Sequence, residues 1–139
     1  MKKIEATIQH FKLGAVKDAL VAAGVQGMTV SEVNGVGEQS RTMTYRGTSH
    51  TVDSVAKVRV ETIVADREAE RIVDTIFQSA HTGDLGDGSI VVSEIKSVTR
   101  IRTGETEDSD EEFIRHQLLT RPRFTEQKSA NLPAYQHSN

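Results

Sequence analysis

The chain has 139 residues, 36% of them hydrophobic and 4% aromatic, and its formal net charge is −3 at pH 7. This length predicts one domain with a modest aliphatic core that would gain from burying further surface between subunits. The charge gives no reason to expect nucleic-acid binding, and the absence of cysteine excludes disulfides, thiol catalysis and cysteine metal sites. No apolar run suits a signal peptide or a bilayer span, so we expect a cytoplasmic protein without direct membrane insertion.

The start of the chain predicts a strand, a helix and a second strand. Residues 3–8 alternate polar and apolar side chains, as a half-buried strand does. Apolar residues between positions 13 and 23 fall on one helical face, and Gly24 is well placed to end that helix. Residues 28–33 predict the second strand.

The middle of the chain predicts a long loop, a strand and a second helix. Residues 34–54 are rich in Gly, Ser and Thr and predict a loop of about twenty residues, too long for a hairpin turn and of a size that is usually functional or disordered. Residues 58–64 resume as a strand. Asp66 is placed to cap a helix whose apolar positions between 69 and 80, Phe77 included, predict a buried stripe.

Residues 82–88, with the sequence TGDLGDG, form a glycine-rich loop before strands predicted at 90–92 and 97–102. Three glycines let the backbone turn its N–H groups toward a ligand. In an extended strand Arg100 and Arg102 would lie on one face. A glycine cradle beside two guanidinium groups fits a di- or triphosphate, and an ordinary turn beside solvated arginines is the alternative.

The order of these elements is β-α-β-β-α-β, which predicts a ferredoxin-like α+β sandwich. Both helices would cover one face of the sheet, and self-association is the natural way to cover the other. The histidines show no metal-ligand spacing, so we expect no structural metal.

Residues 107–139 differ in character and predict a C-terminal extension to a domain spanning 1–106. The acidic run at 107–112 predicts a solvated linker, and residues 113–119 could form one or two amphipathic turns. Three hypotheses follow: the extension reaches basic residues around a nucleotide site, it covers a subunit cleft, or it is a disordered arm.

Several sequence blocks, in the right order, resemble the PII signal-transduction protein family over residues 1 to about 106. The opening MKKIEA, the segment GVQGMTV at 24–30 and YRG at 45–47 match family landmarks. Within the segment at about 82–89, Thr82-Gly83 and Gly86-Asp87-Gly88 match the family's B-loop, and RIRTGE at 100–105 matches its C-terminal nucleotide site. The resemblance implies a ferredoxin-like homotrimer that binds ATP, ADP or AMP in clefts between subunits and signals through a mobile T-loop at about 37–54.

The resemblance also implies roles for individual residues by matching position. The phosphates would lie against Gly86, Asp87, Gly88, Arg100 and Arg102, with Ser89 beside them. The adenosine would be surrounded by Thr29, Glu61, Val64 and the backbone near Gly35 and Gly37. Gln39 would orient Mg²⁺, which arrives only with a nucleotide, when 2-oxoglutarate binds, and Lys57 would pair with a carboxylate of that ligand. The predicted partner-binding residues are Tyr45, Arg46, Gly47, Thr48, Ser49 and His50.

The chain departs from the family pattern where effectors and modification act. Ser89 replaces the usual lysine after Gly-Asp-Gly, and Glu38 replaces an arginine beside the same pocket, which tilts the site toward ADP or AMP. The base of the T-loop is altered at Ser40-Arg41, which disfavours 2-oxoglutarate. His50 stands where many relatives carry the uridylylated tyrosine, so uridylylation there is excluded.

The predicted function is a trimeric adenine-nucleotide sensor, not an enzyme, that regulates a transporter or an enzyme of nitrogen or carbon metabolism through its T-loop. The partner would be a membrane transporter, of ammonium or bicarbonate, or a metabolic enzyme. The departures favour a PII-like regulator of inorganic-carbon uptake that answers to bicarbonate, ADP and AMP. A slow nucleotide hydrolase is the enzymatic alternative, disfavoured because no carboxylate or histidine is evidently placed to activate water.

Overall fold

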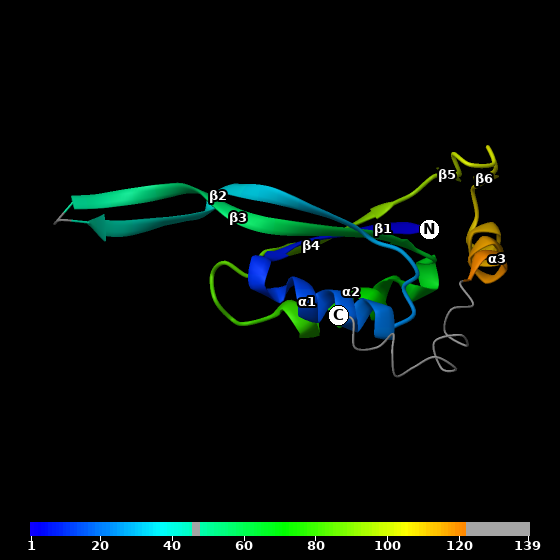
Figure 1. Cartoon of the computed structure of the whole chain (residues 1–139), viewed down its shortest axis with the longest axis horizontal. Coiled ribbons are helices and arrows are strands. Elements are labelled where there is room, and N and C mark those ends of the chain that lie inside the picture. The colour runs from blue at the N-terminus through cyan, green and yellow to red at the C-terminus, as the bar shows by residue number, and fades with distance from the viewer. Residues whose placement is uncertain (46–47, 122–139) are drawn as a thin grey trace, which may run out of the picture.

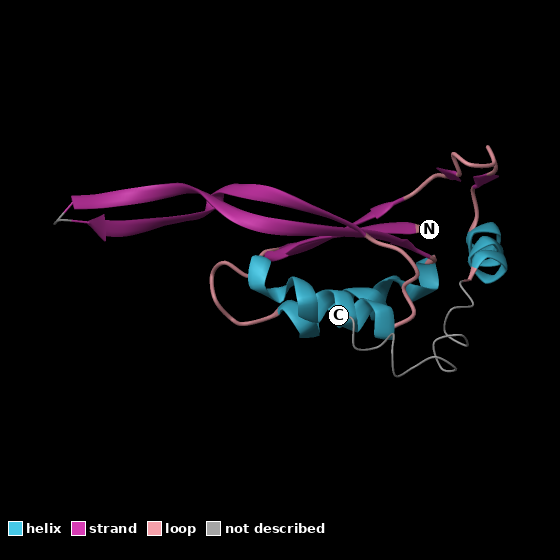
Figure 2. Cartoon of the chain, in the orientation of Figure 1, coloured by secondary structure: helices cyan, strands magenta, loops and turns pink. Residues whose placement is uncertain are grey.

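In the computed structural model, residues 1–45 and 48–121 are described, with side chains described at 1–36 and 55–121. A four-stranded antiparallel sheet has the order β2-β3-β1-β4, formed by β1 (Lys2–Gln9), β2 (Thr29–Tyr45), β3 (Thr48–Val64) and β4 (Ser89–Glu94). Helices α1 (Leu13–Ala22) and α2 (Ala69–Ala80) lie side by side against one face of this sheet (Figures 1 and 2). The predicted β-α-β-β-α-β ferredoxin-like order is therefore confirmed.

The core lies between the sheet and the two helices. Alternate residues of β1 and β3 point toward the helices, and residues at helical spacing on α1 and α2 meet them. The largest fully buried side chains of this core are Ile4, Ile8, Val16, Leu20, Val58, Val60, Ile72 and Ile76. The apolar periodicity in the sequence thus identified the buried face of each element.

The end of α1 forms as the sequence predicts. Gly24 has a φ of 92°, a left-handed conformation that glycine adopts without strain. The N–H of Gly24 donates to the carbonyl of Val21 at 3.0 Å, and that of Val25 donates to Leu20 at 3.0 Å. These two bonds satisfy carbonyl groups left open at the helix end, so the chain turns directly into β2.

Two expectations about α2 are wrong. A short 3-10 helix, η2 (Asp66–Glu68), precedes α2, and no side chain caps either one. Asp66 instead contacts the N-terminal amine at 2.9 Å, because the start of β1 lies beside it. Phe77 is not part of the buried stripe: its side chain is 47% exposed and its ring stacks on His81.

The prediction of a loop at 34–54 is also wrong, because β2 and β3 continue through this segment as paired strands. β2 and β3 pair from Thr29–Glu61 out to Tyr45–Thr48, with a register shift between Val36 and Arg41. The hairpin projects well beyond the helices (Figure 1). Residues 46–47 lie outside the described part of the chain.

The strand predicted at 97–102 is much shorter than expected. β5 (Val98–Thr99) pairs with β6 (Thr106–Glu107), and residues 101–103 form a turn between them. The N–H of Arg100 donates to the carbonyl of Glu105 at 2.8 Å, and the N–H of Gly104 donates to that of Arg100 at 2.7 Å. Arg100 and Arg102 therefore do not share a strand face.

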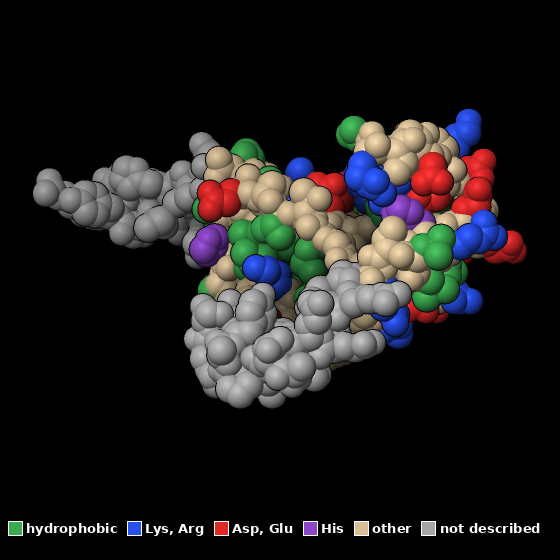
Figure 3. Space-filling model, turned by 45° about the vertical axis from the view of Figure 1, so that its right-hand side comes forward, with side chains coloured by type: hydrophobic (Ala, Val, Ile, Leu, Met, Phe, Trp, Pro, Cys, Tyr) green, Lys and Arg blue, Asp and Glu red, His purple; other side chains and the backbone are tan. Residues whose placement is uncertain are grey.

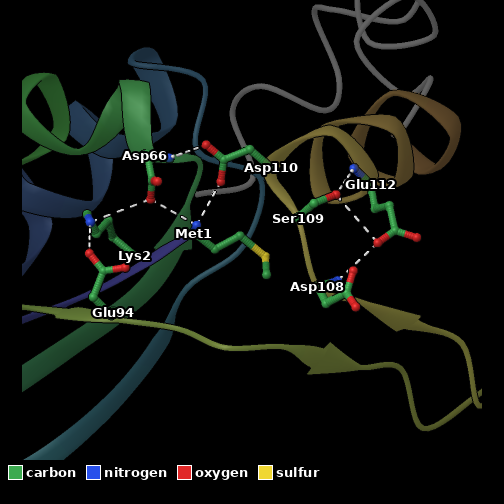
Figure 4. Close-up of polar contacts among 8 residues, drawn as sticks. All are labelled: Met1, Lys2, Asp66, Glu94, Asp108, Ser109, Asp110 and Glu112. Atoms are coloured by element: carbon green, nitrogen blue, oxygen red, sulfur yellow. Dashed lines mark hydrogen bonds and ion pairs between the residues drawn. The ribbon is translucent and has the colours of Figure 1, made fainter.

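The acidic run at 107–112 is not a linker, because Glu107 belongs to β6 and the second half of the run begins a helix, α3 (Asp110–Thr120). The Ser109 hydroxyl accepts from the N–H of Glu112 at 3.2 Å, and the Glu112 carboxylate accepts from the N–H of Asp108 at 3.2 Å (Figure 4). Acidic side chains in the first turn also suit the positive end of the helix dipole. The sequence at 107–112 is thus a helix start with reciprocal capping.

Helix α3 docks beside the start of β1. The Asp110 carboxylate accepts from the Met1 amine at 2.7 Å and from the N–H of Asp66 at 2.9 Å (Figure 4). Burial would lower the pKa of this amine, but its hydrogen bonds to Asp110 and Asp66 outweigh burial and raise the pKa. The Gln26 side chain adds a bond to the carbonyl of Gln117 at 3.3 Å. The helix is therefore fixed to both the sheet and the α1–β2 turn.

Candidate functional site

The glycine-rich loop at 82–88 is organised by the carboxylate of Asp87. This carboxylate accepts from the N–H groups of Thr82 and Gly83, both at 2.8 Å, and from the Gln9 side chain at 2.7 Å. It also accepts from the Thr82 hydroxyl, and this bond is the largest cause that holds the pKa of Asp87 well below its usual range. Asp87 therefore shapes the loop and stays ionised.

Gly88 brings the loop into close contact with β1. Its φ is 97°, and a Cβ built on it would lie 1.8 Å from the carbonyl oxygen of Thr7. Next to it, the carbonyl of Gly86 accepts from the ammonium group of Lys57, a side chain only 2% exposed. Since Lys57 and Gln9 are paired residues of β3 and β1, the loop is fixed to the sheet at that end.

A second group of predicted residues lines a cavity of about 630 Å³ at the other end of the sheet, which we call the α3 pocket. Its walls come from the α1–β2 turn, the end of β3, the start of α2 and helix α3. Thr29, Glu61, Val64 and Arg100 line it together, and Phe113 of α3 closes it. Thr29 and Glu61 are directly paired across β2 and β3, which explains why they meet. The volume and the mixed apolar and polar walls suit a small organic ligand.

Arg100 is held in the α3 pocket by residues that follow it in the chain. Its Nε and Nη2 donate to the two oxygens of Glu107 at 2.8 and 2.7 Å. Its guanidinium lies 5.9 Å from the centre of the Phe113 ring, and His116 Nδ1 lies 3.4 Å from Glu107 Oε2. The hydrogen bonds from Arg100 lower the pKa of Glu107, although burial acts in the opposite direction. Figure 3 shows acidic and basic side chains intermixed at this end of the molecule.

The face of the sheet opposite the helices carries charged side chains next to the α3 pocket. Lys3 Nζ lies 2.9 Å from Glu5 and 3.6 Å from Glu61, and Arg59 Nε lies 3.8 Å from Glu5. The pKa of Lys3 is raised and that of Glu5 lowered, chiefly by the hydrogen bond between them. No element of the described chain covers this face, as the view of the two layers shows (Figure 2).

The glycine-rich loop and Arg100 lie at opposite ends of the sheet. The loop joins β4 at Ser89, which pairs with Thr7, whereas the chain leaves β4 where Ile95 bonds to Met1. At about 3.3 Å per residue, the length of β1 alone separates these ends by roughly 20 Å. The expectation of a glycine cradle beside two guanidinium groups is therefore wrong for a single chain.

The remaining predicted residues are dispersed. Arg102 lies exposed in the turn at 101–103, and Ser89 is exposed at the start of β4. Gly35 pairs with Val55 on the hairpin. Side chains are not described at 37–54. The predicted roles of Gly37, Glu38, Gln39 and the partner-binding residues at 45–50 therefore fall outside the described part of the chain. Among the described residues, no group of three or more His, Asp or Glu side chains could hold a metal ion, and no helix is long and apolar enough to span a membrane.

Sequence reasoning missed two residues that position the site. Gln9 holds Asp87, and nothing in its sequence context pointed to this contact. Phe113 is buried and its ring lies against Arg100. An aromatic residue just after an acidic run was a signal that could have indicated this docking. Glu107 does reach Arg100, as one of the three hypotheses for the extension anticipated.

Comparisons with known proteins agree with this fold. The family model described as nitrogen regulatory protein P-II matches residues 1–105. A nitrogen regulatory protein P-II of Microchaete diplosiphon is 52% identical over 106 residues, covering 76% of this chain and 95% of that protein. Those of Rhizobium meliloti and Klebsiella oxytoca are 51% and 48% identical over 107 and 110 residues, covering 76% and 78% of this chain and 96% and 98% of theirs. Helix α3 follows the matched region, and the chain belongs to the nitrogen regulatory protein P-II family.

Proposed function

We propose that this chain is an adenine-nucleotide-sensing regulator whose ligand site is completed between subunits of a homotrimer. The observation that carries the proposal is the separation of two complementary half-sites in one chain. The glycine-rich loop offers a backbone cradle fixed by Asp87 and Lys57. The α3 pocket offers Arg100 with polar and apolar walls. A neighbouring copy that brings its loop to this pocket would complete a nucleotide site.

The open sheet face supports self-association. Its Lys3, Glu5 and Arg59 side chains carry both signs of charge, so a second copy could pair with them in a symmetric assembly. The hairpin formed by β2 and β3 extends far from the helices, which suits a segment that docks on a partner (Figure 1). In the proposal, bound ATP, ADP or AMP alters the hairpin, and the hairpin acts on a transporter or an enzyme of nitrogen or carbon metabolism.

A mixed-subunit experiment tests the shared site. One variant, Asp87→Ala, disables the loop, and a second, Arg100→Ala, disables the pocket. Each variant alone should bind ATP, ADP and AMP weakly in calorimetry. In refolded mixtures, interfaces that combine one intact loop with one intact pocket should recover affinity, with mixed trimers confirmed by native mass spectrometry. Mixtures that bind no better than either variant would contradict a site made from two subunits.

The same titrations, made on the unmodified protein with Mg²⁺, identify the effector. If 2-oxoglutarate tightens ATP binding, the protein is a nitrogen-type sensor. If bicarbonate instead tightens ADP or AMP binding, the inorganic-carbon alternative holds. Ser89 supports this alternative, because a serine beside Gly88 offers no positive charge to the phosphates of ATP. The relatives carry the name of regulatory proteins, which fits binding without turnover. Linear release of many phosphates per subunit would support the hydrolase alternative.

A further inference from the structure

Arg100 already binds an anion, and that anion belongs to the same chain. Glu107 contacts it through two nearly equal hydrogen bonds of 2.7 and 2.8 Å, the paired geometry with which arginine also binds phosphate. The Glu107 side chain is 7% exposed and that of Arg100 is 30% exposed, so the carboxylate is buried while the guanidinium still reaches solvent. The proposed phosphate ligand is thus occupied when no nucleotide is bound.

We propose that Glu107 is an internal competitor for the nucleotide phosphates at Arg100, and that nucleotide binding releases the segment at 107–120 from the α3 pocket. The inference rests on the proposed function, because it assumes that Arg100 contacts a nucleotide. A phosphate that reached Arg100 with Glu107 still in place would meet a carboxylate at close range. Glu107 takes the Nε–Nη2 edge of the guanidinium, so in the proposal the phosphate binds this edge and the carboxylate leaves it.

Release of Glu107 would carry α3 with it. Glu107 lies two residues before Ser109, the residue that caps α3, and Phe113 one turn into the helix packs on the same Arg100. His116, on the next turn, lies 3.4 Å from Glu107. Arg100, Glu107, Phe113 and His116 form one cluster, which we call the Arg100 cluster. If Glu107 left Arg100 alone, Phe113 and His116 would lose part of their contacts, so we expect the cluster to separate as a unit.

The docking of α3 is weak enough to be reversed by a ligand. Within α3, whose residues are all described, Phe113 is the one buried side chain. The hydrogen bonds of α3 to the rest of the domain lie at the rim: Asp110 accepts from the Met1 amine and from the N–H of Asp66, and Gln117 accepts from Gln26. Elements with few buried apolar contacts open at low free-energy cost, and a ligand shifts that equilibrium toward the state it binds.

The decisive experiment compares Glu107→Gln with the matched control Glu111→Gln, both in the full-length chain. Glu111 lies exposed on α3, so its variant removes the same charge without touching Arg100. Calorimetric titration with the magnesium complexes of ATP, ADP and AMP should show ATP binding to Glu107→Gln roughly tenfold tighter than to the unmodified protein. The gain should fall from ATP to AMP, because fewer phosphate charges compete. The control should stay within about twofold, the effect of a distant surface charge.

Hydrogen exchange of the unmodified protein tests the release itself. Amides at 110–120 should exchange faster with saturating ATP, while amides of β1 and β3 should not. Equal affinities for Glu107→Gln and Glu111→Gln, or unchanged exchange of α3 in the nucleotide complex, would overturn the competition and leave the nucleotide-sensing function standing. Absence of nucleotide binding in every protein, Glu107→Gln included, would overturn both.

Discussion

Replacement of Gly88 by alanine tests whether this glycine is needed for the packing of the sheet as well as for any ligand. Gly88 has a φ of 97°, and an added Cβ would lie 1.8 Å from the Thr7 carbonyl oxygen and 2.8 Å from its carbon. Both are backbone atoms, which cannot rotate away as a flexible side chain can. Gly83 in the same loop has a φ of 92° but no atom within 4 Å of such a Cβ. The pair therefore separates steric overlap from backbone strain.

The magnitudes follow from these two terms. Left-handed strain costs an alanine about 1–2 kcal/mol, and this is the whole effect expected for Gly83→Ala. In Gly88→Ala the Cβ must also move from 1.8 Å to the 3.4 Å of an ordinary contact. That shift parts β4 from β1 where Ser89 pairs with Thr7, and each lost ladder hydrogen bond costs about 1 kcal/mol. With about two ladder hydrogen bonds lost, we expect Gly88→Ala to lower the free energy of unfolding by about 3–4 kcal/mol in total.

Urea unfolding followed by circular dichroism measures both variants. One protein concentration must be used throughout, because association of the folded state would add to the apparent stability. The unmodified protein is the reference and Gly83→Ala the matched control. Equal losses in the two variants would show that Gly88 does not approach β1 as closely as the structure describes, and that the glycine is retained for another reason.

Two further predictions concern carboxylates. Asp87→Asn should destabilise the protein near neutral pH. The difference in stability from the unmodified protein should shrink as pH falls below about 4, because the pKa of Asp87 is lower in the folded than in the unfolded chain and its contribution is lost in acid. Urea unfolding from pH 2 to 7 measures this difference, and a difference that stays constant with pH would contradict the prediction. Asp110→Asn should weaken the docking of α3 by about 1 kcal/mol, seen as faster hydrogen exchange at 110–120, whereas Asp108→Asn should not. The effect of Asp110→Asn should diminish at high pH, since the raised pKa of the Met1 amine stabilises the fold below about pH 8 and is lost as pH rises through the folded value.

The fold could be predicted because its core obeys simple periodicities. Buried residues recur at every second position in β1 and at three- and four-residue spacing in α1 and α2. Gly24 marked the end of α1 because a left-handed position there needs a glycine. These signals are local, so one sequence was enough to find them.

The hairpin could not be predicted from the same signals. Residues 34–54 lack an alternating apolar pattern, and the register shift between Val36 and Arg41 interrupts any repeat that pairing would impose. Strand formation there depends on the partner strand and not on intrinsic preference. The start of α3 was different, since Ser109 and Glu112 stand in the spacing of a capping box, and the acidic run was interpreted by its charge alone.

The sequence predicted residues of the candidate site but not how one chain distributes them. Thr29, Glu61 and Val64 came only from the family resemblance, and the structure brings all three to the α3 pocket. Within one chain the glycine-rich loop and Arg100 do not meet, although they are close in the sequence. β4 runs along the sheet between them, so the 11 residues from Ser89 to Thr99 carry the chain from one end of the sheet to the other.

The two half-sites use their carboxylates in opposite ways, and this contrast links the fold to the proposed regulation. Asp87 is bound by N–H groups of its own loop, so its charge is satisfied inside the motif and its role persists whether or not a ligand is present. Glu107 is bound by the very guanidinium that a phosphate would need. In the proposal a ligand exchanges with Glu107 but not with Asp87, because Glu107 precedes a helix whose one buried side chain is Phe113, whereas the partners of Asp87 belong to its own loop and to β1. If so, the extension sets the nucleotide concentration at which the shared site fills, and the glycine-rich loop sets which shape of ligand fills it.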